Sequence, residues 1–181
     1  MKSFFFFTCL LAIFSAFFLF NIDQNREQQA MAEDVVSTDE ELHPHVKEQK
    51  DTLIERADDI GIDVVITEGY RSHDRQDDLY AQGRTESGDI VTNAEAGESY
   101  HNYGLAIDFA IENSDGEIIW DIEYDGTESG ESDWLEVAAI GEDLGFEWGG
   151  HWNDYPHLQM DFGLSIEELQ EAKQQLDNES G

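Results

Sequence analysis

The stretch Ser99-Tyr100-His101-Asn102-Tyr103-Gly104-Leu105-Ala106-Ile107-Asp108 decides how the rest of the chain is interpreted. Its second half opens an apolar run, residues 105–111, that predicts a β-strand. Asp108 lies inside this run, where a buried carboxylate is costly unless a partner neutralises it. A metal ion is a suitable partner, and His101 lies only seven positions earlier. Gly104 and Ala106, between them, are small enough to let the backbone pass close to a metal or a neighbouring strand.

A second cluster, Asp154-Tyr155-Pro156-His157, supplies what such a site still lacks. His157 would be a third protein ligand and would leave the fourth position of a tetrahedral zinc ion for water. Zinc lowers the pKa of bound water to about 7, and Asp154 would then accept its proton. On spacing alone, Asp154 can also be an ordinary turn carboxylate. The two clusters together favour the zinc centre of a hydrolase.

Hydrophobic periodicity and capping residues predict short helices and strands around these clusters. Pro44 suits the first turn of a helix that ends at Gly61, and a strand follows at 62–67. Ser72 would cap a short helix that reaches Ala81, and residues 84–98 predict a surface loop beside the site. The remaining predicted elements are a hairpin of 105–111 and 117–120, a helix from Ser132 to Gly145, a strand at 157–161, and a last helix opened by the capping box of Ser165 and Glu168. We therefore expect an α+β fold, with a small antiparallel sheet flanked by helices in a single domain.

The first 32 residues predict export. An apolar stretch from Phe4 to Phe20 follows Lys2, and Ala30-Met31-Ala32 resembles a cleavage site that lies well beyond the stretch. Residues 1–32 are thus a cleaved signal peptide or an N-terminal membrane anchor, and an uncleaved segment would be the chain's only membrane contact. Residues 33–41 predict a flexible acidic leader, and residues 42–181 the catalytic domain. We expect an exported protein that is extracellular or associated with the cell wall.

The charge of the chain limits its partners. With 9 basic and 42 acidic residues, the net charge is -33 at pH 7. No nucleic-acid partner is expected, because phosphates require a basic footprint. The acidic surface favours solubility, and we expect a monomer. The stretch 121–126 partly resembles a calcium loop, but Ser132 stands where the bidentate Glu should be, which favours a solvated acidic loop.

The motifs together resemble a known family. The pattern S-x-H-x-x-G-x-A-x-D with a later D-Y-P-H is similar to zinc peptidases of the VanY-type D-alanyl-D-alanine carboxypeptidase superfamily. It is most similar to their CwlK-like L-alanyl-D-glutamate endopeptidase branch. The resemblance spans roughly residues 42–162 and includes Leu42-His43-Pro44, Glu68-Gly69-Tyr70-Arg71-Ser72, Tyr80-Ala81-Gln82-Gly83-Arg84-Thr85 and Trp148-Gly149-Gly150.

The resemblance implies roles for individual residues. The implied ligands of Zn²⁺ are His101, Asp108 and His157. The implied general base is Asp154.

Further implied roles concern the substrate. Arg71 would hold a substrate carboxylate or stabilise the oxyanion, with a surface ion pair as the alternative. Ser99 and Gln76 match positions that support substrate binding. His151 departs from the pattern, which usually has Asp there. Its imidazole could touch the site or compete for the metal, but we expect the side chain to be exposed.

The implied activity is zinc-dependent hydrolysis of an amide bond in the stem peptide of peptidoglycan. The L-alanyl-D-glutamate bond is given by the branch resemblance alone. Two alternatives stay open. One is a D-alanyl-D-alanine carboxypeptidase, which would release free D-alanine. The other is a non-catalytic module that keeps the zinc site and binds the cell wall.

Overall fold

The computed structural model describes residues 22, 24, 26–36 and 40–179 of the 181-residue chain. They fall into two compact units, one within residues 37–166 and one that combines residues up to 36 with those from 167 onward. In the smaller unit, residues 26–35 are helical, and α5 (Ile166–Glu179) buries Leu169 and Ala172. Residues 33–35, at the start of the predicted leader, continue the first helix.

The N-terminal apolar stretch, residues 4–20, lies outside the described residues. Among the residues that are described, no helix is both long enough and apolar enough to span a membrane. The domain boundaries expected at residues 32 and 41 stay predictions.

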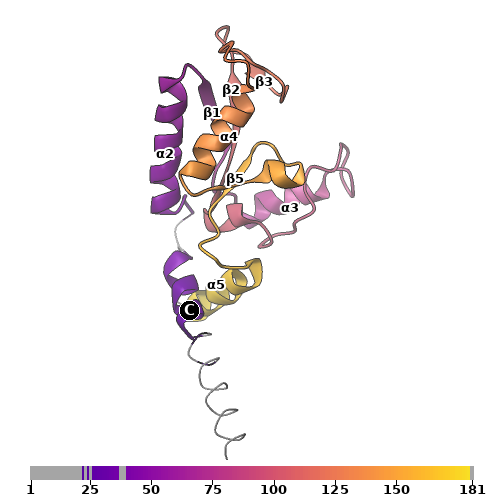
Figure 1. Ribbon diagram of the computed structural model, residues 1–181. Helices are drawn as coiled ribbons and strands as arrows, with labels where there is room; N and C mark the ends of the chain where they lie inside the picture. Colours follow the sequence, from indigo (N-terminus) through magenta and orange to yellow (C-terminus); the bar gives the residue numbers. More distant parts are fainter. Residues whose placement is uncertain (1–21, 23, 25, 37–39, 180–181) are drawn as a thin grey trace, which may run out of the picture. The chain divides into compact units, whose positions relative to one another are not determined.

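The larger unit confirms the α+β fold with a small antiparallel sheet. The sheet order is β1-β2-β5-β4, with β3 also paired to β2, and each of these pairings is antiparallel. Along the chain (Figure 1), the elements are α2 (Pro44–Asp59), β1 (Asp63–Glu68), α3 (His73–Ala81), the 3-10 helix η1 (Tyr100–Tyr103), β2 (Ala106–Glu112), β3 (Ile118–Ile119), α4 (Asp133–Asp143), β4 (Glu147–Trp148), the 3-10 helix η2 (Gly149–Trp152) and β5 (His157–Gln159).

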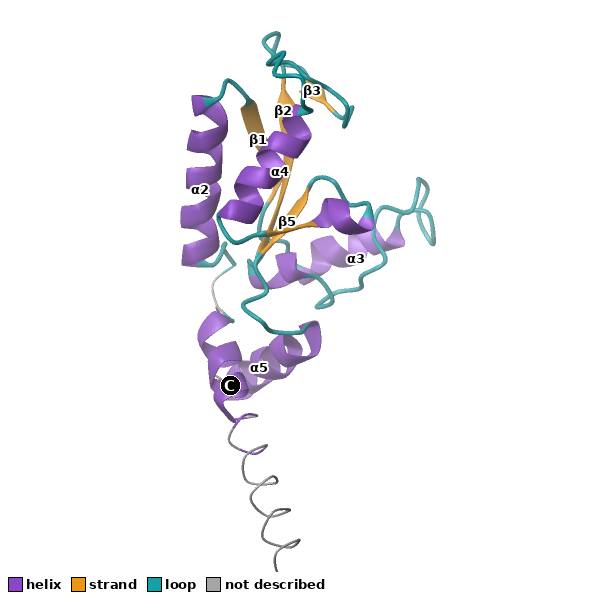
Figure 2. Ribbon diagram, in the orientation of Figure 1, coloured by secondary structure: helices purple, strands orange, loops and turns teal. Residues whose placement is uncertain are grey.

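Strand β2 separates the hydrophobic core from the face that carries the candidate site. Its odd-numbered residues, Ile107, Phe109 and Ile111, are fully buried. The ring of Phe109 lies 5.0 Å from that of Trp134 on α4, so this face of the strand points toward the helices. Helices α2 and α4 lie next to one another beside the strands (Figure 2). Because side chains alternate along a strand, Asp108 points to the opposite face.

A serine hydroxyl caps α3 but not α4. The Ser72 hydroxyl accepts a hydrogen bond from the Arg75 amide at 3.2 Å, which confirms the predicted cap. The Ser132 hydroxyl makes no such bond and donates instead to the carbonyl oxygen of Ile122. It therefore ties the start of α4 to the preceding loop.

Gly104 joins η1 to β2 in a conformation that requires glycine. Its φ is 69°, in the left-handed region, and its carbonyl oxygen accepts from the His43 amide at 3.0 Å. A Cβ atom at this position would overlap the carbonyl oxygen of Glu41. Gly104 therefore lets the start of the domain cross over the segment that carries His101.

Replacing Gly104 with Ala should destabilise the protein by about 2–4 kcal/mol, because left-handed strain of about 1–2 kcal/mol adds to the overlap with Glu41. The matched control is Gly116→Ala, since Gly116 has a φ of 78° but open space around its Cβ position. Denaturant unfolding of both variants measures the difference. Equal losses of stability would contradict this role of Gly104.

Candidate metal centre

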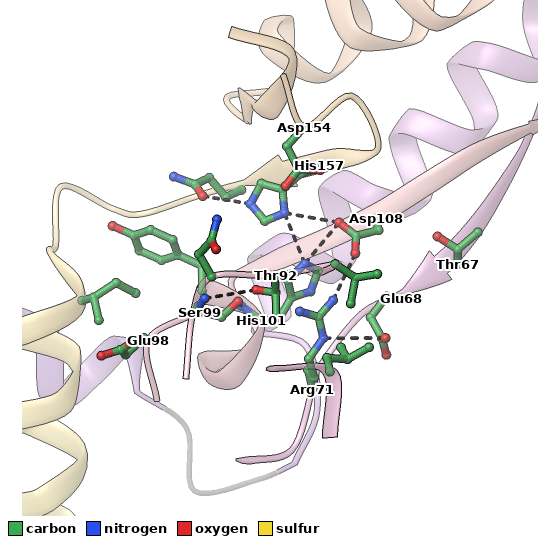
Figure 3. A pocket seen from close by; sticks show the side chains of 17 residues that line it. Thr67, Glu68, Arg71, Thr92, Glu98, Ser99, His101, Asp108, Asp154 and His157 are labelled. Carbon is green, nitrogen blue, oxygen red and sulfur yellow. Dashed lines mark hydrogen bonds and ion pairs between the residues drawn. The ribbon is translucent and has the colours of Figure 1, made fainter. Parts of the chain in front are cut away.

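Three secondary-structure elements bring the three predicted ligands together. His101 lies on η1, Asp108 in β2 and His157 at the start of β5. Asp108 and His157 are direct partners across the antiparallel β2–β5 pair, so their side chains share one face of the sheet. Figure 3 shows both imidazoles directed at the Asp108 carboxylate.

The ligand atoms form a triangle with equal sides. His101 Nε2 and His157 Nδ1 each lie 3.2 Å from Asp108 Oδ1 and 3.2 Å from one another. In a tetrahedral zinc site with bonds of about 2.0–2.1 Å, two ligand atoms are separated by about 3.3 Å. The cluster therefore has the dimensions of a single-metal site, with one position left for water or substrate.

The protonation of His101 suits metal binding. Its Nδ1 lies 2.7 Å from the carbonyl oxygen of Gly69. Because a carbonyl oxygen can only accept a hydrogen bond, Nδ1 carries the proton and Nε2 presents a lone pair to the cluster. The same arrangement fixes the orientation of the imidazole ring.

Asp108 uses its two oxygens for different partners. Oδ1 faces the imidazoles, and Oδ2 accepts from the Arg71 guanidinium at 3.2 Å. Burial alone raises the pKa of Asp108, but the imidazoles of His101 and His157, in their protonated forms, donate hydrogen bonds and positive charge that outweigh burial and lower the pKa well below its usual value. Asp108 therefore stays ionised, as a metal ligand must.

The pKa of His157 shifts in the opposite direction. Burial lowers it, but hydrogen bonds to Asp108 and Gln159 and the nearby carboxylate charges more than offset this effect, so the pKa is raised. A proton on His157 therefore competes with a metal ion for the site.

Asp154 reaches the cluster from the loop between η2 and β5. Its amide donates to the carbonyl oxygen of Gly149 at 2.8 Å, and a Cβ atom at Gly149 would overlap the carbonyl oxygen of Asp154. Partial desolvation in the pocket is the largest effect on Asp154 and raises its pKa, as does the charge of Asp108, against the opposing effect of His157. A carboxylate with a raised pKa is a stronger base.

Arg71 is a buried residue of the site and not a surface ion pair. Its side chain is only 10% exposed and is held by Asp108 and by Gln76 Oε1, the latter at 3.1 Å. The backbone is tied down as well, since the Arg71 amide donates to the His101 carbonyl oxygen at 3.0 Å. Its Nε lies 3.6 Å from a Glu68 oxygen and makes no hydrogen bond. The guanidinium is thus fixed in the pocket.

Gln76 and Ser99 have different relations to the pocket. Gln76 is fully buried, does not line the pocket, and donates to the Ala94 carbonyl oxygen at 2.8 Å while it holds Arg71. In this position it supports Arg71 and the loop. Ser99 lines the pocket, and its hydroxyl accepts from the His101 amide at 3.4 Å as the cap of η1.

His151 is exposed, as expected. Its Nε2 lies 2.7 Å from a Glu142 oxygen, which connects η2 to α4 and takes the imidazole away from the metal cluster. In the acidic loop, Asp125 accepts from the amides of Ser129 and Gly130, both at 3.0 Å. This carboxylate thus stabilises the loop itself.

The cluster opens into a pocket of about 520 Å³. One wall comes from the predicted surface loop, which Arg84 holds through hydrogen bonds to the carbonyl oxygens of Tyr80 and Thr92 at 2.7 and 2.9 Å. The predicted site residues that line the pocket are Arg71, Ser99, His101, Asp108, Asp154 and His157. Most of the lining was not predicted from the sequence and consists of Thr67, Glu68, Leu79, Val91, Thr92, Asn93, Ala94, Glu98, Tyr100, Gln159 and Ile166.

A three-ligand metal cluster, a nearby carboxylate of raised pKa and a buried guanidinium in one open pocket are the features of a metal-dependent hydrolase. The chain belongs to the VanY family, whose model, described as D-alanyl-D-alanine carboxypeptidase, matches residues 39–161.

The chain is also similar to individual proteins. The peptidoglycan L-alanyl-D-glutamate endopeptidase CwlK of Bacillus subtilis (strain 168) is 55% identical over 155 residues, which are 84% of this chain and 92% of that protein. Among solved structures, the L-Ala D-Glu endopeptidase ChiX of Serratia marcescens is 22% identical, with a TM-score of 0.45 over 67% of this chain and 81% of that one. The L,D-carboxypeptidase DacB of Streptococcus pneumonia is also 22% identical, with a TM-score of 0.46 over 74% and 72% of the two chains.

Metal binding should stabilise the fold through His101. When Zn²⁺ is added to chelator-treated protein at 100 times its dissociation constant, the free energy of unfolding should rise by about 2.7 kcal/mol, because the metal binds only the folded state. The variant His101→Ala should lose this gain. The control His151→Ala should keep it, because His151 pairs with Glu142 outside the cluster. Thermal unfolding with and without metal measures the effect, and an undiminished gain in His101→Ala would contradict the assignment.

Proposed function

We propose that this protein is a zinc-dependent peptidase that hydrolyses the L-alanyl-D-glutamate bond in the stem peptide of peptidoglycan. The observation that carries the proposal is the equal-sided cluster of His101, Asp108 and His157 beside Asp154. The choice of bond is supported by the 55% identity to CwlK, which extends over nearly the whole of that protein.

The residues of the pocket have separate roles in hydrolysis. A zinc ion held by His101, Asp108 and His157 would polarise the scissile carbonyl and lower the pKa of a bound water. Asp154 accepts a proton from the attacking water while the water oxygen bonds to the carbonyl carbon. Asp154 then returns the proton to the leaving nitrogen as the amide C–N bond breaks. The products are the carboxylate of one amino acid and the amine of the next.

Arg71 contributes a fixed positive charge. Asp108 and Gln76 each occupy one terminal nitrogen of its guanidinium, and further N–H groups remain for an anionic group of the substrate or for the developing oxyanion. Because Arg71 is one of only 9 basic residues in a chain of net charge -33, it offers an acidic stem peptide a rare complementary charge.

Export of the protein fits this function, because peptidoglycan lies outside the cytoplasmic membrane. Residues 1–32 would direct export as a cleaved signal peptide or as an anchor, and the enzyme would act as a monomer at the wall.

A second candidate function is D-alanyl-D-alanine carboxypeptidase activity, which the description of the family model favours. The two activities release different products from one substrate. Defined muropeptides incubated with zinc-loaded protein and analysed by mass should show cleavage after L-alanine. Release of free D-alanine would instead establish the carboxypeptidase.

Replacing Asp154 with Asn should lower the rate of hydrolysis by about 10²–10⁴-fold, because the variant has no general base, while zinc binding is retained. The control Asp115→Asn removes an equal charge from the exposed turn before β3 and should leave the rate unchanged. Hydrolysis and metal content are measured on the same samples. An unchanged rate in Asp154→Asn would refute this mechanism. A wild-type protein that binds zinc and the wall but cleaves nothing would be a non-catalytic module.

A further inference from the structure

A chain of hydrogen bonds leads from the metal cluster to the edge of the sheet. Gln159 follows His157 by two residues and therefore shares its face of β5, and Glu147 of β4 is its direct cross-strand partner. His157 Nε2 lies 2.9 Å from Gln159 Oε1, and Gln159 Nε2 lies 2.9 Å from Glu147 Oε2. Both His157 and Gln159 are at least nine-tenths buried.

The donor and acceptor groups of these side chains fix the direction of both hydrogen bonds. A carboxylate can only accept hydrogen bonds, so Glu147 turns the NH₂ group of the Gln159 amide toward itself. The Gln159 oxygen then faces His157, and the imidazole must donate from Nε2. Nδ1 is left without a proton and presents its lone pair to Asp108 and His101.

We propose that Glu147 and Gln159 are positioning residues that select the metal-binding tautomer of His157. In the other tautomer, a proton on Nδ1 would donate to Asp108 Oδ1, 3.2 Å away, and would occupy the place of the metal. For His101, the backbone carbonyl oxygen of Gly69 selects the metal-binding tautomer, whereas for His157 this depends on two side chains. The inference rests on the proposed zinc site, and it assigns roles to residues that neither bind the metal nor react.

The variant Gln159→Leu removes the acceptor and should weaken zinc binding by about 10–100-fold. Gln159→Glu alone should also weaken it, because two carboxylates would then meet where Gln159 now donates to Glu147. The double variant Glu147→Gln/Gln159→Glu reverses the amide–carboxylate pair and should restore the affinity to within a few-fold of wild type. The control Glu112→Gln, on the edge of β2 away from the cluster, should change nothing. Competition with a chromophoric chelator on the full chain, without substrate, measures each affinity.

The position of the proton gives a second, independent measurement. In zinc-loaded wild-type protein labelled with ¹⁵N-histidine, NMR should show His157 protonated at Nε2 and metal-bound through Nδ1. A proton on Nδ1, or zinc binding by Gln159→Leu as tight as in wild type, would overturn the proposal. If Gln159→Leu does not fold, the nitrogen assignment in the wild-type protein decides alone.

These measurements distinguish a failure of the positioning role from a failure of the proposed function. A wild-type protein that binds zinc with the stated tautomer but cleaves no stem peptide refutes the peptidase and leaves the positioning role in place. A wild-type protein that binds no zinc overturns both.

Discussion

Three side-chain atoms, His101 Nε2, Asp108 Oδ1 and His157 Nδ1, lie 3.2 Å from one another on one face of this sheet. When the Gly69 carbonyl oxygen and the Gln159 amide hold the two imidazole protons on the far side of each ring, as we propose for His157, all three facing atoms are hydrogen-bond acceptors. Such an arrangement is repulsive unless a cation occupies its centre. The rest of the site serves to hold these atoms in place.

The two faces of strand β2 have different roles in holding the three ligand atoms together. One face carries Ile107, Phe109 and Ile111 into the core against α4, which anchors the strand. The other face presents Asp108 to β5 and to the buried guanidinium of Arg71. Since the same strand carries core and site, the hydrophobic packing that stabilises the domain also positions the ligands.

Much of this arrangement could be predicted from the sequence, because its signals are local. An Asp inside an apolar run indicated a partnered carboxylate, Pro44 indicated the start of α2, and Ser72 indicated the cap of α3. The two-residue strand β4 is too short to show any periodicity, so it was not predicted. Without β4, the partner of Gln159 could not be inferred, although the two-residue spacing from His157 already placed Gln159 on the same face.

The role of Gln76 shows a second limit of sequence patterns. A family motif identifies a position but does not distinguish a residue that touches substrate from one that supports such a residue. Gln76 is fully buried and accepts a hydrogen bond from Arg71. This supporting position depends on how α3 packs, and the sequence motif does not contain that information. Burial of a polar side chain depends on tertiary contacts that no single stretch of sequence contains.

The most direct test of the account is a crystal structure of the zinc-loaded protein with anomalous diffraction recorded at the zinc absorption edge. We expect one zinc ion per chain, bound by His101 Nε2, Asp108 Oδ1 and His157 Nδ1, with Asp154 facing the open coordination position. Zinc bound elsewhere on the chain, or held by the other nitrogen of His157, would contradict it.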